Sequence, residues 1–278
     1  MNHALIRQLR SNRAAVAAAV ILATIVVLAA TAGLAFPGNP LYIVGPAELW
    51  PFQSGRFLLG TDAVGRDIAA IIMHGSRTAL AVGFAATAVT ILTGVTIGAL
   101  GGYFGGWIDE MLTRITELFQ TSPHIIFILA VVTVLGPRIA VVVLAIGLTN
   151  WTSVARVARA EFLSWRERDF VLADHAIGMG NLRIIVREIL PNALPPIIVL
   201  VSFTVASSIL LEAALAFLGY SDPNIASWGR LIGEGRQSLR SSWYISAIPG
   251  IAIMLTVLAM NFIGDALTDA LDLRSGKP

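Results

Sequence analysis

The sequence predicts an all-α membrane protein that crosses the bilayer six times. Hydrophobic residues make up 56% of the 278 residues and charged residues only 13%, which is about half the charged share of an average soluble domain. The apolar residues also fall into six long runs, each near the ~20 residues that a helix needs to cross a bilayer. Strands of a membrane β-barrel would instead alternate apolar and polar residues over short segments. A water-soluble enzyme, a disordered chain and a nucleic-acid-binding protein are therefore disfavoured.

The six runs differ in length and in the residues that interrupt them. The first is longer than the ~7–15-residue apolar core of a cleaved signal peptide, so we expect it to remain as a helix. The third contains Pro123 and His124, the fourth is the shortest, and the fifth continues past Glu212 toward Tyr220. The spans are expected over residues 14–36, 78–108, 118–137, 139–155, 189–211 and 241–264.

The placement of lysine and arginine predicts the orientation of the chain. Arg7, Arg10 and Arg13 precede the first span with no acidic residue among them, and such a basic flank favours the cytoplasmic side. With six spans, the C-terminus and the basic connection over residues 156–190 fall on the same side. This arrangement puts 12 of the 19 basic residues in the cytoplasm, so we expect both termini there.

Two long connections are expected on the external side. In the first, residues 37–77, the small or apolar residues Ile68, Ile71, Ile72 and Gly75 recur at helical spacing, which predicts a short interfacial helix that enters the second span. In the second, residues 219–240, the sequence Asp-Pro-Asn at 222–224 predicts a turn.

The cytoplasmic connection carries a helix–turn–helix pattern. Phe170, Ala173, Asp174 and Ile177 fall at i, i+3, i+4 and i+7, so one helical face is mainly apolar. The sequence Gly-Met-Gly at 178–180 predicts a break. Asn181 is expected to cap a second helix, which runs to Leu190 and ends at Pro191. The apolar face would then be covered either by a partner protein or by the chain's own helix ends.

These residues resemble a known motif. Phe-Val-Leu-Ala-Asp-His-Ala-Ile-Gly at 170–178, followed by Glu-Ile-Leu-Pro at 188–191, resembles the EAA coupling loop of binding-protein-dependent ABC importer permeases. Leu172 stands where the loop usually begins its Glu-Ala-Ala, and Asp174 replaces the second Ala. The resemblance to the C-type subunit of the peptide and nickel branch extends along nearly the whole chain. It includes residues 59–67, 75–77, 212–219, 227–229 and 261–272.

The resemblance implies a type I ABC importer permease fold and a division of the chain. Residues 1–36 would hold the cytoplasmic N-terminus and first span, and residues 37–77 the external loop with its interfacial helix. Residues 76–268 would form the ABC transmembrane type-1 permease domain, which includes the coupling loop over 166–191, and residues 269–278 the cytoplasmic tail. The residues expected to couple to an ATPase are Arg168, Phe170, Ala173, Asp174, Ile177, Gly178, Leu190 and Pro191.

The resemblance also implies partners and a location. A bacterial inner membrane would hold the chain beside a homologous second permease, forming a heterodimer. Two ATP-binding cassette ATPase subunits and an external solute-binding protein would complete the importer, and no nucleic acid is expected. The implied substrates are di- or oligopeptides, with nickel or another small solute as the alternative.

The chain lacks the residues that would let it hydrolyse ATP itself. The phosphate-cradling motif G-x-x-x-x-G-K-[ST] requires a lysine, and the one lysine is Lys277, followed by Pro278. ATP and Mg would therefore be used by the partner ATPases, and this chain is expected to be neither an enzyme nor a holder of cofactors. There is no cysteine, and the four histidines show no metal-ligand spacing. An intramembrane enzyme would need a catalytic constellation, and a secondary transporter would need inverted repeats; neither pattern is present.

Two further groups of residues inside the spans are candidates for helix packing and for the translocation pathway. Gly94, Gly98, Gly102 and Gly106 form overlapping G-x-x-x-G steps, which favour close helix packing either within the chain or against the partner permease. Glu212 lies in an apolar span, where an acid needs water or a partner. It would either line the translocation pathway or form a structural hydrogen bond.

A third group lies near the end of the last span. Asn261, Asp265 and Asp269 share one face at i, i+4 and i+8. They would either line the inner mouth of the pathway or be solvated at the membrane surface.

Overall fold

The structure, a computed structural model, describes residues 13–121 and 123–272. Arg7, Arg10 and most of the predicted tail over 269–278 lie outside the described residues. Within the described part, the regular structure is helical apart from two isolated bridges, Ser54–Phe57 and Thr61–Asp67. The predicted all-α class is therefore confirmed.

The long helices are those expected to cross the membrane. Among the described residues, five helical runs are long and apolar enough to span it, and a sixth span results if α4 and α5 are taken together. The helices are α2 (Arg13–Ala35), α3 (Ile68–Phe104), α4 (Gly106–Thr121), α5 (His124–Leu135), α6 (Ile139–Arg166), α7 (Asp169–Ala176), α8 (Asn181–Arg183), the π-helical η1 (Ile184–Ile189), α9 (Leu190–Phe217), α10 (Trp228–Gly235), the 3₁₀-helical η2 (Arg236–Ser238) and α11 (Tyr244–Asp272).

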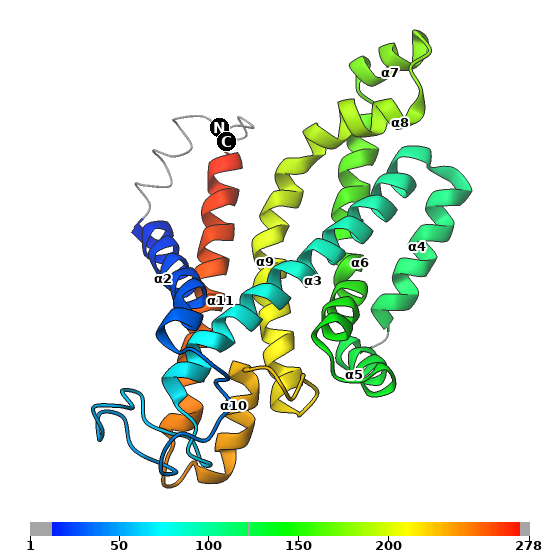
Figure 1. The fold of residues 1–278 in the computed structure, drawn as a ribbon. Helices are drawn as coiled ribbons and strands as arrows, with labels where there is room; N and C mark the ends of the chain where they lie inside the picture. Colours follow the sequence, from blue (N-terminus) through cyan, green and yellow to red (C-terminus); the bar gives the residue numbers. More distant parts are fainter. Residues whose placement is uncertain (1–12, 122, 273–278) are drawn as a thin grey trace.

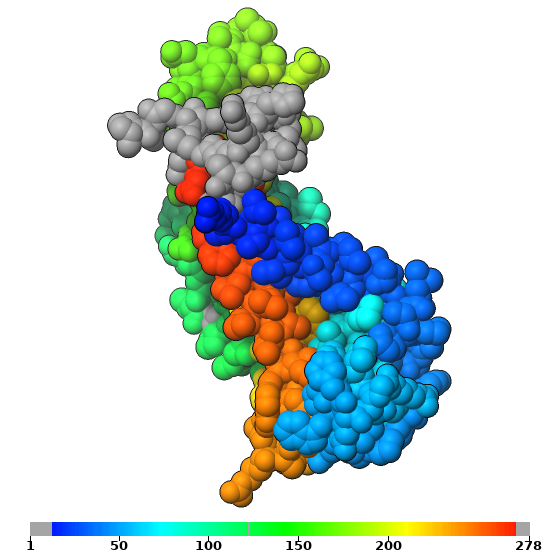
Figure 2. Space-filling model, turned by 90° about the vertical axis from the view of Figure 1, so that its left-hand side faces the viewer, coloured from blue at the N-terminus to red at the C-terminus, as the bar shows by residue number. Residues whose placement is uncertain are grey.

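The two ends of the molecule carry different elements (Figure 1). α7 and α8 project at one end, and residues 36–67 gather with α10 at the opposite end. Figure 2 shows α2 lying across α11 on one face, with residues 36–67 beside them. Two apolar clusters hold the spans together. One joins α2, α3, α9 and α11 through Ile25, Ala79, Ile209 and Met260. The other joins α3, α5, α6 and α9, with Ile146 fully buried at its centre.

α3 begins earlier and ends earlier than predicted. It is one continuous helix of 37 residues, about 55 Å long at 1.5 Å per residue, so it crosses the bundle obliquely (Figure 1). The interfacial helix expected from Ile68 is the first part of α3 and not a separate helix. α3 begins at Ile68 because the Asp67 side chain caps its N-terminus, accepting a hydrogen bond from the Ala69 amide at 2.8 Å. α3 stops at Gly105, where φ is +65°, a value that glycine adopts easily.

The third predicted span is not a single straight helix. Residues 118–137 are divided between α4 and α5, which are inclined by 84° to one another. Pro123 precedes α5 with φ −61° and ψ 114°. Proline lacks an N–H and cannot continue the hydrogen bonding of a helix interior, so it explains the break.

Two further helices run beyond the residues predicted for their spans. α6 continues to Arg166, whereas α9 continues through Glu212 to Phe217, as the sequence predicts. α11 continues to Asp272. The predicted cytoplasmic second helix does not end at Pro191 either. Asn181–Phe217 is one helical run, in which Pro191 directly follows the π-helical η1.

Candidate functional site

The α7–α8 element is a helix–turn–helix built on a glycine turn. Gly178 has φ +80°, and the Met179 amide donates to Asp174 O at 2.9 Å across the turn. No atom lies within 4 Å of a Cβ built on Gly178, so the backbone conformation and not lack of space requires glycine here. The turn predicted over 178–180 is thus present, and its direction is set by Gly178.

One side of this element is buried against the chain itself. Val171 and Ile184 are fully buried and pack with Tyr103 and Phe162 from the ends of α3 and α6. The Tyr103 hydroxyl donates to Asn181 Oδ1 at 3.0 Å and lies 3.3 Å from His175 Nε2. Asn181 was expected to cap the following helix, but Gly180 takes that position without a side-chain bond. The Asn181 side chain accepts the tyrosine proton instead.

The other side of the element is exposed and apolar. Ile177 is 77% exposed and Leu182 is 75% exposed. We call this surface the apolar α7–η1 face; its large residues are Phe170, Leu172, Ile177, Leu182 and Val186. The predicted face with Phe170, Ala173 and Ile177 is therefore exposed among the described residues. The chain's own helix ends are covered by the opposite side, through Val171 and Ile184.

The other predicted coupling residues lie in different surroundings. Ala173 is exposed and Asp174 is half-buried. The Arg168 guanidinium lies 5.5 Å from the centre of the Trp165 ring, in a cation–π contact. Leu190 packs on the buried side and Pro191 is exposed at the start of α9.

Three of the four predicted packing glycines bring α3 onto α6. A Cβ built on Gly94, Gly98 or Gly102 would lie 2.4–2.7 Å from a carbonyl oxygen of α6. Gly106 does not belong to the stripe, because it begins α4 with φ +53° and has no atom within 4 Å of a built Cβ. The close packing seen here is within the chain.

Replacing Gly98 by alanine should separate α3 from α6. The new Cβ would meet Ala155 O at 2.4 Å, and overpacking of this kind costs about 1–3 kcal/mol. We expect a lower thermal unfolding midpoint for Gly98→Ala in detergent. Gly250→Ala is the matched control, since nothing lies within 4 Å of its built Cβ; equal midpoints for the two variants would show that the contact is not tight.

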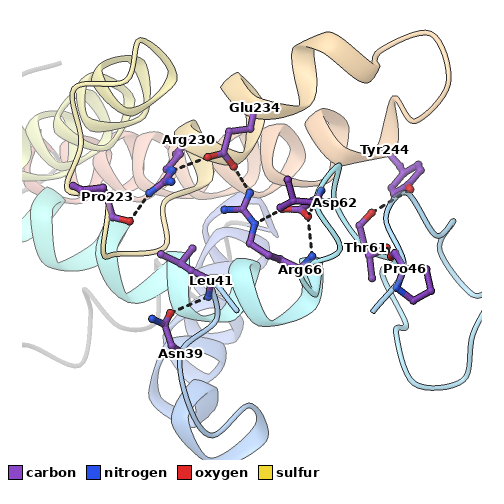
Figure 3. Close-up of polar contacts among 11 residues, drawn as sticks. Asn39, Leu41, Pro46, Thr61, Asp62, Arg66, Pro223, Arg230, Glu234 and Tyr244 are labelled. Atoms are coloured by element: carbon purple, nitrogen blue, oxygen red, sulfur yellow. Dashed lines mark hydrogen bonds and ion pairs between the residues drawn. The ribbon is translucent and has the colours of Figure 1, made fainter. Parts of the chain in front are cut away.

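A buried ion network at the opposite end was not foreseen from the sequence (Figure 3). Arg66 Nε lies 2.5 Å from Asp62 Oδ2, and Arg66 Nη2 bonds to Glu234 of α10. Arg230 Nε donates to Glu234 Oε1 at 2.8 Å, and its Nη1 donates to Pro223 O at 2.6 Å. The Arg66 side chain is 9% exposed and that of Asp62 only 2%. We call these five residues the cap network, since they join the two long connections.

Further hydrogen bonds fix the same end to the start of α11. Thr61 Oγ1 donates to Pro46 O at 2.6 Å. The Tyr244 hydroxyl is placed to donate to Leu49 O at 2.9 Å or to Thr61 O at 3.2 Å. The connection over residues 37–67 is therefore a structured cap and not a loose loop.

The cap network also changes the ionisation of its carboxylates. Burial opposes the charged form of Glu234, but hydrogen bonds from Arg230 and Arg66, together with their charges, hold its pKa below the ordinary value. Outside the network, burial is the larger effect at the neighbouring Asp67 and raises its pKa. A lowered pKa means that Glu234 stabilises the fold above its unfolded pKa, and that this contribution is lost as pH falls through the folded pKa.

The predicted pathway acids lie in two different surroundings. Glu212 is buried, and its Oε1 accepts a hydrogen bond from Ser227 Oγ at 2.8 Å. This bond ties α9 to the residue before α10. Asn261 is half-buried, whereas Asp265 and Asp269 are exposed along one face of α11. The structure does not bring Glu212 together with these three residues.

Comparison with known proteins decides the family. The family model described as "binding-protein-dependent transport system inner membrane component" matches residues 94–277, about two thirds of the chain. The chain belongs to this permease family. The matched region begins at the first glycine of the α3 stripe and contains α7, η1 and Glu212.

Two relatives of this permease match nearly all of its length. It is 37% identical over 267 residues to the dipeptide transport system permease protein DppC of Alkalihalophilus pseudofirmus, covering 96% of this chain and 88% of that one. It is 34% identical over 271 residues to the oligopeptide transport system permease protein OppC of Haemophilus influenzae, with coverage of 96% and 86%.

A solved structure confirms the predicted importer-permease fold. A chain of the MetNI methionine ABC transporter, in an inward-facing conformation, superposes with a TM-score of 0.56 and 16% sequence identity. The match covers 72% of this permease and 96% of that chain.

The Ser227–Glu212 bond leads to a prediction for this permease. Glu212→Ala leaves the Ser227 hydroxyl without its acceptor and should lower the free energy of unfolding by about 1–3 kcal/mol. Glu212→Gln keeps an acceptor oxygen, so both its thermal unfolding midpoint and its transport rate should stay near those of the unmodified permease. Loss of transport by Glu212→Gln at an unchanged midpoint would assign the carboxylate to the pathway instead.

Proposed function

We propose that this chain is one permease subunit of an ATP-driven importer of di- or oligopeptides, which an external binding protein delivers. Its family is that of binding-protein-dependent transport components. The relatives that it matches over nearly all of its length bear the names of dipeptide and oligopeptide permeases. Because the chain has no phosphate-cradling motif, ATP with Mg is hydrolysed by separate subunits.

The observation that carries this proposal is the apolar α7–η1 face. It projects at one end of the bundle, on a turn of defined geometry, while its reverse side is anchored to α3 and α6 (Figure 1). Large apolar residues with charged neighbours suit a protein interface, where burial supplies contact and charges set the register. We assign this face to docking one ATPase subunit, and an equivalent face on a homologous second permease to docking another.

The orientation follows from that assignment and from the basic residues. The α7–η1 face lies in the cytoplasm of a bacterium, both termini lie on the same side, and the chain is held in the inner membrane. The cap network then lies on the outer side, where the binding protein releases its solute.

Ligand binding by the partner binding protein tests the substrate class. The binding protein encoded beside this permease should show a raised unfolding temperature with di- or oligopeptides, by an amount that grows with peptide concentration. Stabilisation by nickel or another small solute, without any effect of peptides, would contradict the peptide assignment. ATP hydrolysis by the purified ATPases should also rise when this permease and its partner are added.

A further inference from the structure

α3 and α6 are packed closely against each other over residues 89–102 of α3. At the α7–α8 end of this pair, the Arg166 guanidinium of α6 donates to Gly102 O at 3.2 Å. α3 runs from the end that carries residues 36–67 to the end that carries α7 and α8 (Figure 1). A displacement applied to the α3–α6 pair at one end of the molecule would therefore reach the other end.

The covalent link from this pair to the α7–α8 element is a joint and not a helix. α6 ends at Arg166, and α7 begins at Asp169. Between them, Glu167 has φ −90° and ψ 2°, and Arg168 is extended, with φ −77° and ψ 145°. The i to i−4 hydrogen bonding of a helix is therefore interrupted at this joint. On its other side the element belongs to the helical run Asn181–Phe217, so it continues directly into α9.

One buried side chain ties the α3–α6 pair to the element. Tyr103, near the end of α3, is 8% exposed, and its hydroxyl donates to Asn181 Oδ1 at 3.0 Å. The same hydroxyl lies 3.3 Å from His175 Nε2, and the two rings are stacked with their centroids 6.0 Å apart. His175 belongs to α7 and Asn181 to α8, so one hydroxyl joins the element on both sides of the Gly178 turn. In the part of the chain that the structure describes, no other side chain of α3 or α6 hydrogen-bonds to residues 169–190.

We propose that Tyr103 is a positioning residue for transport, whose hydroxyl holds the α7–α8 element at a fixed angle to the α3–α6 pair. The proposal rests on the proposed docking of an ATPase on the apolar α7–η1 face. With the hydroxyl in place, movement of the docked ATPase turns α3 and α6 together with α9. Without it, the element turns about Glu167 and Arg168, and α3 and α6 no longer follow. The docking face itself is unchanged, because Tyr103 packs on the buried side of the element.

The amount of peptide imported per ATP hydrolysed tests this proposal. Loss of folded complex lowers import and hydrolysis together, so it leaves their ratio unchanged. Tyr103→Phe keeps the buried ring and removes only the hydroxyl. The net contribution of one hydrogen bond corresponds to a factor of about two to ten in an equilibrium, so the ratio should fall by that factor while the ATPase subunits still co-purify.

A second variant shows whether the effect passes through the bond to Asn181. Asn181→Ala removes the acceptor from an exposed residue and should lower the ratio, by no more than Tyr103→Phe does. The double variant should have the ratio of Tyr103→Phe alone, because both substitutions remove the same bond and their effects are then not additive.

Tyr244→Phe is the matched control. It also removes the hydroxyl of a buried tyrosine, but one that bonds to Leu49 O and Thr61 O at the opposite end, so its ratio should equal that of the unmodified complex. An unchanged ratio in Tyr103→Phe, an equal fall in Tyr244→Phe, additive effects in the double variant, or loss of the ATPase subunits from Tyr103→Phe would overturn the proposal. The proposed function fails separately, if the unmodified complex imports no peptide.

Discussion

The variant Gly178→Asp is expected to abolish import while leaving the two permease subunits assembled. Gly178 has φ +80°, a conformation that aspartate adopts more readily than most residues, so the backbone cost lies at the lower end of about 1–2 kcal/mol. The new carboxylate would also lie beside the apolar α7–η1 face, where docking would bury a charge without a partner. Together these effects exceed the ~1.4 kcal/mol that corresponds to a tenfold loss of affinity, so we expect uptake to fall at least tenfold.

Co-purification and vesicle uptake together would measure this effect. The ATPase subunits should either dissociate or remain bound and hydrolyse ATP without import. Gly180→Ala is a suitable control, because Gly180 has φ −69° and no atom within 4 Å of a built Cβ; it should import normally. Wild-type uptake by Gly178→Asp would mean that residues 166–191 are not the coupling element.

Removal of Arg66 is expected to have the largest effect on stability. Arg66→Met would leave the buried Asp62 carboxylate and the half-exposed Glu234 without their shared guanidinium. Breaking a buried ion pair from one side costs about 3–5 kcal/mol, and the partial exposure of Glu234 favours the lower end of that range. The two long connections should then separate, and the complex should unfold at a lower temperature.

The measurement is the thermal unfolding midpoint, with limited proteolysis of residues 37–67 as a local readout. Arg114→Met removes an exposed i,i+4 pair, which is worth about 0–1 kcal/mol, and serves as the control. Comparable midpoints for the two arginine variants, with no new cleavage in the Arg66 variant, would show that the cap network does not hold this end together.

The spans could be predicted from the sequence wherever charge marks their ends. The first span was expected over 14–36 and is observed at Arg13–Ala35. Prediction failed where a helix continues through a charged residue. In α3, Arg77 donates to the carbonyls of Ala29 and Ala30 of α2. In α6, Arg156 lies on the exposed side of the helix and Arg159 is neutralised by Asp109. Such partners are invisible in a count of apolar residues.

Local signals located the turn at Gly178 but not the end of the helix beyond it. A sharp turn between two helices requires glycine at the turn itself, so the sequence nearby predicts it. Pro191, in contrast, is compatible both with the end of one helix and with the first turn of the next. The π-helical η1 decides between these readings, since the Leu190 amide donates to Ile185 O and carries the helix on into α9.

The cap network could not be predicted in full either, because one of its ion pairs joins residues that are far apart in the sequence. Asp62 and Arg66 are four residues apart, a spacing at which they could have been predicted to pair. Glu234 is 168 residues from Arg66, and no periodicity in the sequence links them.

We expect this permease to move peptides only when an ATPase is docked on the α7–η1 face. Its most direct test is uptake of a labelled dipeptide by proteoliposomes that hold the complete complex and its binding protein. Accumulation should require ATP on the side of the α7–η1 face and should be absent when the ATPase subunits are omitted. Accumulation of dipeptide without ATP or without those subunits would show that import does not depend on ATPase docking at this face.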